Sequence, residues 1–536
     1  MRRKNTAILL AIGLSVTAVL STACGNSGAS STAAEDKPAA EETAQDQQAE
    51  EAPEAEQPEK EPAAEAEQPA KEDAAEAEKP ANEEIGTAQA QTEQPLAAAG
   101  SQLDSVKPAA DQFHCELEEV GSFAYDSNYR VTYDSIVHAE SEYYTFCGAD
   151  GKSVDDRELV NMDYLGWGLY SGTLKSEESI NSTGLVSIDG EVIIPFEAAI
   201  IEFPAKTRPD VQPRYVLVFT GTEPTDNESE ALFFATDRMF AIMAQEGDTY
   251  YKGTLRVFDL VGRRYVSGLE FSQGTDSDFA QIGDNIMTDL GDKPAVYAPD
   301  GKAVYTAQGR LDYNGKYFME RIDTTCHIFD ADGKELYNTE NILNVLDYSS
   351  DLFQVYNNGK YGVINCKGES FLSGEWDYIY EESKGRFRVK NNGDTGYTLV
   401  AADNTAVAQA ENLYAADELG FYVYGDSTYT MISPGNRVVE GLEESNENLV
   451  FTKDDDASYM IINTGEFTQS PGEDADDIGK GIFTVENGGK KALYDAFTGE
   501  ELLGAEYDEI DDINEDYIYT VKGGTMTVYK VSVVGN

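Results

Sequence analysis

The sequence predicts an all-β protein: an array of four-stranded antiparallel repeats with propeller-like packing (alternatively a β solenoid), preceded by a disordered acidic linker. Turn-forming residues recur at intervals of 30 to 39 residues through most of the chain. The segments between turns are 4 to 6 residues long and rich in aromatic and β-branched side chains, which are typical of strands. No Phe, Tyr or Trp precedes Phe113, so the first fifth of the 536 residues lacks the side chains of a hydrophobic core.

Residues 1–24 have the parts of an export signal. A basic start at residues 2–4 is followed by an apolar run of about 14 residues, too short to span a bilayer comfortably, and by small residues leading to Cys24. The segment Leu20–Cys24 resembles a bacterial lipoprotein signal, although Ser21 stands where that family usually has Leu. The resemblance implies that Cys24 is lipidated and becomes the mature N-terminus. An ordinary secretory signal with an incidental cysteine is the alternative.

Lipidation of Cys24 would place the protein at the cell membrane, on its extracytoplasmic face. Each acyl methylene buried in the bilayer contributes about 0.8 kcal/mol, and two chains already give stable anchoring. The membrane is therefore one expected partner, reached through the lipid anchor.

Residues 25–112 are predicted to be a disordered linker rich in Ala, Glu and Pro. Within residues 35–93 there are 20 acidic residues and 4 lysines, and prolines interrupt every run that would favour a helix. A flexible coil of this length reaches on the order of 50 Å, and charge repulsion extends it. The linker is expected to hold the folded part away from the membrane.

The predicted β-repeat domain covers residues 113–536, with a turn that recurs in each unit. The turn sites are Gly151, Gly190, Gly262, Gly301, Gly333, Gly368, Asn404, Gly435, Gly465 and Gly499. One interval, the 72 residues from Gly190 to Gly262, is long enough to contain a degenerate unit. Asp or Asn ends the strand before many of these turns, where its side chain can bond to backbone amides.

The clearest unit is centred on Asn357–Gly368. Asn358-Gly359 predicts a type I′ hairpin turn, because both central residues of that turn need a positive φ. Strands are expected at Tyr361–Ile364, Glu369–Leu372, Trp376–Glu381 and Arg386–Lys390, forming one antiparallel meander.

These units resemble the WG-repeat family of bacterial envelope proteins. The best matches are Gly359–Asn365 with Asp377-Tyr378, Gly184–Asp189 with Ile193–Pro195, and Gly489–Asp495 with Tyr507–Ile510. Tyr361 stands where that family has its Trp. The resemblance implies a repeat architecture and carries no catalytic residues over to this chain.

The number of units bears on how they stack. A four-stranded sheet of about 34 residues cannot bury both of its apolar faces alone, so neighbouring units must stack. Ten or eleven units exceed the usual 4–8 blades of a propeller. One large ring, two smaller propellers and an open array all remain compatible with the sequence.

No site for a metal or cofactor is predicted. The four cysteines Cys115, Cys147, Cys326 and Cys366 permit two disulfides, with Cys115–Cys147 and Cys326–Cys366 closest in sequence, but free core thiols are favoured. Cys326-His327 near Asp330 is interpreted as part of a strand and not as a metal site. The acidic clusters Asp454–Asp456, Glu473–Asp477 and Asp508–Asp516 are interpreted as solvated loops.

Two functions, binding and glycan hydrolysis, are compatible with the sequence, and a passive structural spacer is a third option. The net charge of −60 disfavours nucleic acid as a partner. Because no phosphate-binding loop, zinc-protease motif or nucleophile elbow occurs, the favoured function is a non-catalytic binding module at the cell surface, for a protein or a glycan. The alternative is an envelope glycan hydrolase, which would need two carboxyl groups roughly 5–10 Å apart. The 32 tyrosines suit both packing and recognition, and no individual ligand-binding residue is predicted.

Overall fold

The computed structural model describes residues 112–535 except for several short segments and one longer one. The segments left out are 133, 139–144, 155–156, 176–180, 207–210, 226–249, 273, 275, 291–292, 347–350, 426–427, 443–448 and 454–457. Cys24, the export signal and residues 25–111 of the predicted linker lie outside the described residues. Within the described part, no helix has the length and apolar character needed to cross a membrane.

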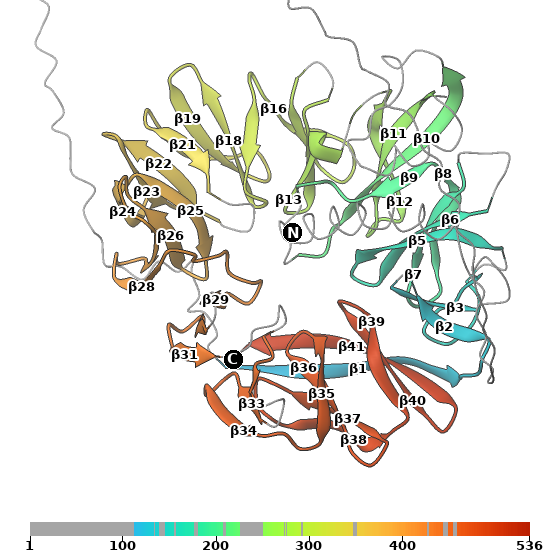
Figure 1. Cartoon of the computed structure of the whole chain (residues 1–536). Helices are drawn as coiled ribbons and strands as arrows, with labels where there is room; N and C mark the ends of the chain where they lie inside the picture. The colour runs from blue at the N-terminus through green and yellow to red at the C-terminus, as the bar shows by residue number, and fades with distance from the viewer. Residues whose placement is uncertain are drawn as a thin grey trace, which may run out of the picture. The chain divides into compact units, whose positions relative to one another are not determined.

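Eleven small antiparallel sheets follow one another around a ring in the described part of the chain (Figure 1). Sheets 1 to 4 are, in order, β2 (Tyr129–Thr132), β3 (Ser135–His138) and β4 (Thr145–Phe146); β5 (Leu159–Gly166), β6 (Leu169–Leu174), β7 (Thr183–Ser187) and β8 (Val192–Ala198); β9 (Ile200–Glu202), β10 (Tyr215–Thr225), β11 (Tyr250–Asp259) and β12 (Arg264–Phe271); β13 (Phe279–Ile282), β14 (Asn285–Thr288), β15 (Ala295–Tyr297) and β16 (Ala303–Thr306). The 3-10 turn η2 (Asp276–Asp278) precedes β13.

The remaining sheets continue in the same order. Sheets 5 to 7 are β17 (Leu311–Tyr313), β18 (Tyr317–Ile322), β19 (Thr325–Asp330) and β20 (Glu335–Thr339); β21 (Ile342–Val345), β22 (Phe353–Asn357), β23 (Lys360–Ile364) and β24 (Ser370–Trp376); β25 (Tyr378–Ser383), β26 (Arg386–Lys390), β27 (Tyr397–Ala401) and β28 (Ala406–Ala410). Sheets 8 to 10 are β29 (Tyr422–Gly425), β30 (Tyr429–Ile432) and β31 (Val438–Leu442); β32 (Thr452–Lys453), β33 (Ser458–Ile461) and β34 (Glu466–Gln469); β35 (Glu473–Gly479), β36 (Ile482–Glu486), β37 (Lys491–Asp495) and β38 (Glu501–Tyr507).

The two ends of the described chain meet in sheet 11 and close the ring. This sheet consists of β39 (Glu509–Asn514), β40 (Tyr517–Lys522), β41 (Thr525–Gly535) and the first strand of the chain, β1 (Phe113–Ala124). β1 and β41 pair antiparallel from Phe113↔Gly535 to Ala124↔Thr525, with one bulge near Gly121. The strand that follows the predicted linker is therefore part of the last sheet.

Hydrophobic clusters connect each sheet to its neighbours. Eight such clusters occur among the described residues. Six of them each join two consecutive sheets, from sheets 2 and 3 to sheets 7 and 8; one joins sheets 11, 1 and 2, and one extends from sheet 8 to sheet 11. In one of them Leu255 of sheet 3 packs with Phe279 of sheet 4, and both are fully buried. Each sheet thus covers its apolar faces with two neighbours, which is the packing of a β-propeller. The predicted fold class is confirmed, and the eleven sheets form one ring.

Except for Gly151, which follows β4, the predicted turns lie at the connection between the last two strands of a sheet. Gly368 has φ 79°, and a Cβ there would run into the ring of Tyr337 in the neighbouring sheet. The Asn365 side chain accepts bonds from the Lys367 and Glu369 amides at 2.9 and 3.0 Å. The expected Asx-type turn chemistry is therefore present.

The long interval between Gly190 and Gly262 contains no additional sheet among the described residues. Gly190 lies between β7 and β8, and Gly262 between β11 and β12, so the two turns belong to adjacent sheets. The extra length falls between the paired strands β10 and β11, whose connection includes the segment 226–249 outside the described residues.

The phase predicted for the central unit is wrong. Asn358 and Gly359 have φ 51° and 83°, as expected for the hairpin that joins β22 to β23. The predicted strand Trp376–Glu381, however, spans two sheets, because β24 ends sheet 6 at Trp376 and β25 begins sheet 7 at Tyr378. Short strands separated by tight turns look alike on both sides of a sheet boundary, so the sequence reveals the length of the repeat but not its first strand.

Candidate functional site

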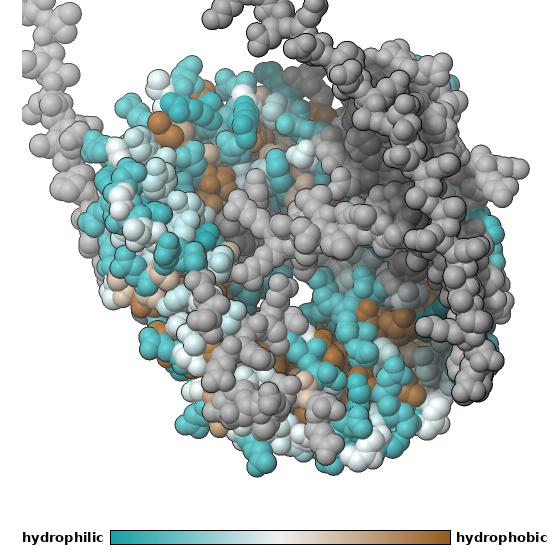
Figure 2. All heavy atoms as spheres, in the orientation of Figure 1, coloured by the Kyte–Doolittle hydropathy of each residue, from teal (hydrophilic) through white to brown (hydrophobic). Residues whose placement is uncertain are grey.

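Exposed tyrosines are concentrated at one sheet of the ring. The described part of the face in Figure 2 is mostly hydrophilic, with apolar residues scattered among the polar ones. Of the four exposed tyrosines among the described residues, Tyr378 and Tyr380 lie on β25, Tyr414 follows β28, and Tyr265 is distant on β12. Three of the four therefore belong to sheet 7 or to the segment that follows it.

We define the tyrosine platform as Tyr378, Tyr380 and Tyr397 with the basic residues Arg388 and Lys390. The rings of Tyr378 and Tyr380 are nearly parallel, 28° apart with centroids at 6.1 Å. The Tyr397 ring meets that of Tyr380 edge-on, at 81° and 5.1 Å. The platform is thus a strip of two aligned rings bounded on one side by a third.

The alternation of β25 explains why the platform faces solvent. Tyr378 and Tyr380 are exposed, whereas Ile379 and Glu381 between and after them are buried. β25 pairs with β26 through Tyr378↔Lys390, which places the lysine beside the first ring. In Figure 1, β25 lies on the inner side of its sheet, toward the centre of the ring.

Arg388 holds the rings in place. Its guanidinium lies 5.5 Å from the Tyr380 centroid and 5.2 Å from that of Tyr397. The same group donates to the Leu413 carbonyl at 2.9 Å and pairs with Glu381 at 3.4 Å. Because the guanidinium is held on several sides, the platform is organised before any ligand arrives.

Glu381 is the buried carboxylate behind the platform. It is 9 % exposed and accepts the Tyr422 hydroxyl at 3.0 Å in addition to its pair with Arg388. Burial, and then the nearby Glu381 charge, raise the pKa of Tyr422, so this hydroxyl stays protonated and remains a donor. Glu381, Arg388 and Tyr422 therefore form a polar network at the boundary between sheets 7 and 8.

Lys390 is a lysine of the platform whose ammonium makes no ion pair with any residue that the structure describes. Its Nζ lies 4.9 Å from the Tyr397 centroid. By contrast, Lys360 of sheet 6 pairs with Asp377 at 2.9 Å. In so acidic a protein an ammonium without a carboxylate partner is a position for an acidic group of a ligand.

A small cavity of about 140 Å³ lies between the turn η2 and strand β14 of the sheet 4 region and the first strands of sheets 5 and 6. Its charged and aromatic walls include Lys206, Asp278, Asp289, Arg310, Asp312 and Tyr313. Lys206 pairs in parallel with Ala280 of β13, and its Nζ lies 5.4 Å from the Tyr313 centroid. Arg310 pairs with Asp312 at 3.1 Å.

Two carboxyl groups of this cavity touch each other. Burial, and then the charge of Asp278 and a hydrogen bond with it, raise the pKa of Asp289. Direct hydrogen bonding places the two groups closer than the roughly 5–10 Å at which glycosidase carboxyls act. This pair does not have the geometry expected for the glycan hydrolase.

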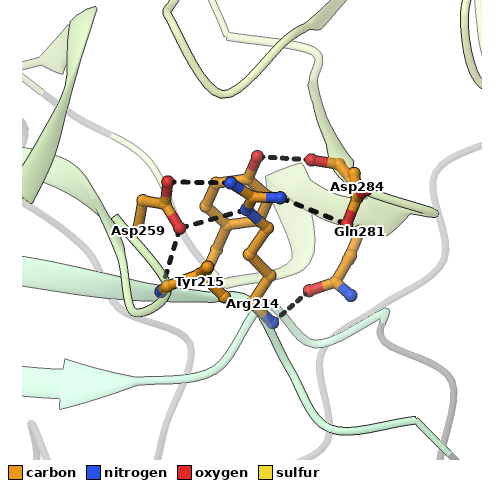
Figure 3. Close-up of polar contacts among 6 residues, drawn as sticks. Arg214, Tyr215, Asp259, Gln281 and Asp284 are labelled. Carbon is orange, nitrogen blue, oxygen red and sulfur yellow. Dashed lines mark hydrogen bonds and ion pairs between the residues drawn. The ribbon is translucent and has the colours of Figure 1, made fainter. Parts of the chain in front are cut away.

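An ion-pair network fixes sheet 3 against sheet 4 (Figure 3). Arg214 donates to both carboxylate oxygens of Asp259, at 3.0 and 3.1 Å, and pairs with Asp284 at 3.1 Å. Burial opposes ionisation of Asp259, but the bonds from Arg214 and from backbone amides outweigh it and lower the pKa of this carboxyl. The Arg214 amide also donates to Gln281 of β13 at 2.7 Å, so the network joins sheet 3 to the first strand of sheet 4.

The cysteines of the described part are free thiols. Cys115, Cys147 and Cys326 are buried and Cys366 is half-buried, and neither Cys115–Cys147 nor Cys326–Cys366 is bonded. Burial raises the pKa of the Cys147 thiol to about 11, which makes it unreactive at neutral pH. The prediction of core thiols agrees with the structure. Cys24, the predicted lipidation site, lies outside the described residues.

Cys326, His327 and Asp330 lie on one strand, as the sequence predicts. His327 Nδ1 lies 3.4 Å from Glu335 Oε2, and Asp330 accepts the Lys334 amide of its turn at 2.9 Å. The described residues contain no group of three side chains arranged to hold a metal ion.

The interpretation of two acidic clusters as loops is wrong. Glu473–Asp477 lies in β35, and most of Asp508–Asp516 lies in β39, the first strands of sheets 10 and 11. In β39, Asp511 and Asp512 are exposed whereas Ile510 and Ile513 are buried, so one face of the strand stays solvated. Acidic residues therefore sit in a first strand without being buried. The third cluster, Asp454–Asp456, lies outside the described residues.

Sequence reasoning did not single out the platform residues. Tyr378 and Tyr380 fall within a predicted strand, and their spacing of two places them on one face. Which face lacks a covering neighbour depends on the arrangement of sheets 7 and 8, which no local pattern reveals.

Comparisons with known proteins add the following. No protein-family model and no curated protein matches the chain. Among solved structures, a eukaryotic initiation factor is similar with a TM-score of 0.34 and 9 % identity, over 76 % of this chain and 97 % of that one. Sqt1 of Saccharomyces cerevisiae has a TM-score of 0.23 and 11 % identity, over 62 % and 95 %. AztD of Citrobacter koseri has a TM-score of 0.21 and 12 % identity, over 53 % and 95 %. The assignment of the fold rests on the paired sheets and the clusters between them.

Proposed function

We propose that this protein is a lipid-anchored β-propeller that binds an envelope component or external ligand at the cell surface without chemistry. The observation that carries the proposal is the tyrosine platform. Arg388, bonded to the buried Glu381 and to the Leu413 carbonyl, holds its rings, and the Lys390 ammonium makes no ion pair with a described residue. Tyrosine and arginine combine apolar area with polar groups at low entropic cost, which suits recognition.

The attachment to the membrane is argued from the sequence of the first 112 residues. Cys24 would carry the acyl chains, and the acidic linker would lead from it to Phe113. Phe113 is well suited to hold a tether, because its amide and carbonyl both bond to the Asn463 side chain, at 2.9 and 2.7 Å. Cys24→Ala should release the protein into the medium or leave its signal uncleaved. Unchanged retention in the detergent phase would contradict lipidation.

The binding function is tested by capture of cell-wall and secreted material on the immobilised full chain. Tyr380→Ala should reduce capture, because it removes the central ring of the platform. Tyr265→Ala is the matched control, since Tyr265 is also 38 % exposed and also lies under an arginine, with Arg256 at 4.1 Å. Equal capture by wild type and Tyr380→Ala would refute the platform as the binding surface.

A further inference from the structure

The exposed area of the platform limits the size of what it can hold. The two exposed rings of the platform, Tyr378 and Tyr380, are 45 and 38 % exposed. With about 200 Å² per tyrosine, they offer together roughly 170 Å². A stable protein–protein interface needs about 800 Å² on each partner. The platform is therefore suited to a narrow chain-like ligand.

The shape of the platform distinguishes between a peptide and a glycan. Peptides that add to a sheet are recognised through backbone hydrogen bonds at its edge, with pockets for alternate side chains, and proline-rich peptides dock in aromatic-lined grooves. The platform is instead a strip of two exposed rings on β25 that are aligned within 28°. The apolar C–H face of a pyranose ring stacks on such a surface, while its hydroxyl groups remain in solvent.

The charge of the platform indicates which glycan fits. Lys390 lies beside Tyr378 in the strand pairing and over the Tyr397 ring at 4.9 Å, so its ammonium is at the side of the strip. Arg388 is engaged by Glu381 and the Leu413 carbonyl, which leaves Lys390 to meet the ligand. A ring stacked on the tyrosines could direct a carboxylate to this ammonium.

Resting on the proposed function, we propose that the platform binds a carboxylated polysaccharide, with pyranose rings stacked on Tyr378 and Tyr380 and a ring carboxylate paired with Lys390. The overall charge of −60 opposes an acidic ligand at long range. At 0.15 M salt this repulsion is screened beyond about 8 Å, so the ammonium at the contact determines the local preference.

The test is calorimetric titration of the full chain in detergent at 0.15 M salt with three probes. They are a galacturonate oligomer, the same oligomer as its methyl ester, and poly-L-glutamate. The acid should bind about two- to fivefold tighter than the ester, the gain expected from one exposed ion pair. Poly-L-glutamate should not bind, and binding equal to that of the glycan would show that the platform takes acidic peptides instead.

Two substitutions separate stacking from charge. Tyr380→Ala should weaken the binding of both oligomers by about tenfold, whereas Tyr265→Ala should leave the binding of both unchanged. Lys390→Met should weaken the binding of the galacturonate oligomer to the level of its methyl ester and leave the binding of the ester unchanged. An acid-to-ester ratio that survives Lys390→Met would overturn the assignment of the ammonium.

The same variants distinguish this inference from the function it rests on. If capture of envelope material depends on Tyr380 but the galacturonate oligomer does not bind, the ligand class is wrong and the binding function stands. If neither depends on Tyr380, both are refuted. Tyr380 is exposed and Lys390 is half-buried, and an unchanged melting temperature checks that the variants are folded.

Discussion

Closure of the ring by β1 can be tested at its first residue, Phe113. This side chain is 5 % exposed and packs between Phe421 of the sheet 8 region, at 5.5 Å, and Phe497 of the sheet 10 region, at 5.6 Å. The first strand of the chain thus reaches past its own sheet to a core shared by sheets 8 to 11. Phe113→Ala removes the aromatic side chain and leaves the backbone hydrogen bonds to Asn463 available.

The expected loss is about 3 kcal/mol in the free energy of unfolding. Replacing a buried Phe by Ala costs about 3–5 kcal/mol. The lower end applies because Phe113 begins its strand, so the surroundings can relax toward the gap. Two aromatic pairs, each about 0.5–1.5 kcal/mol, account for a large share of it.

The measurement is urea unfolding followed by tyrosine fluorescence, with hydrogen exchange of β41 as a second readout. Val261→Ala serves as the control, because Val261 is 72 % exposed and should change stability by less than about 0.5 kcal/mol. Exchange should accelerate in β41 near Gly535, which pairs with Phe113. A loss below about 1 kcal/mol, with unchanged exchange, would show that Phe113 does not lock the ring.

Three further predictions concern stability. Ile364→Ala should lower the free energy of unfolding in urea by about 2–5 kcal/mol, because Ile364 is 2 % exposed. A loss under about 0.5 kcal/mol would show that Ile364 is not part of the core. Gly368→Ala should lower the melting temperature, since φ is 79° and the new methyl would meet Tyr337; an unchanged value would contradict this geometry. Burial raises the pKa of Asp417 to about 6, so its ionisation is harder in the folded state and the free energy of unfolding should fall as pH rises from about 4 to 6. Asp417→Asn keeps an acceptor for the Gly420 and Phe421 amides and should flatten that fall by about 1–2 kcal/mol, as urea midpoints at pH 4.5 and 7.5 will show.

Local patterns in the sequence were sufficient for the fold class. Asn358-Gly359 and the turn at Gly368 require backbone conformations that few residues adopt, and the structure has them. The sheet boundary between Trp376 and Tyr378 was not predictable in this way, because it depends on which strands pair. Membrane attachment through Cys24 stays a prediction from the sequence.

The exposure of the platform could not be predicted from local patterns either, because it depends on whether another segment of the chain covers the first strand of the sheet. β13 is buried at all four positions, and Lys206 in the segment beside it pairs with Ala280. β25 has no such segment among the described residues and alternates between exposed and buried positions. The alternating sequence of β25 is compatible with a covered first strand and with an uncovered one. Exposure of Tyr378 and Tyr380 therefore follows from how the ring is assembled: an uncovered first strand can carry tyrosines in sheet 7 or aspartates in sheet 11, so binding chemistry can differ from sheet to sheet while the buried alternate residues maintain the fold.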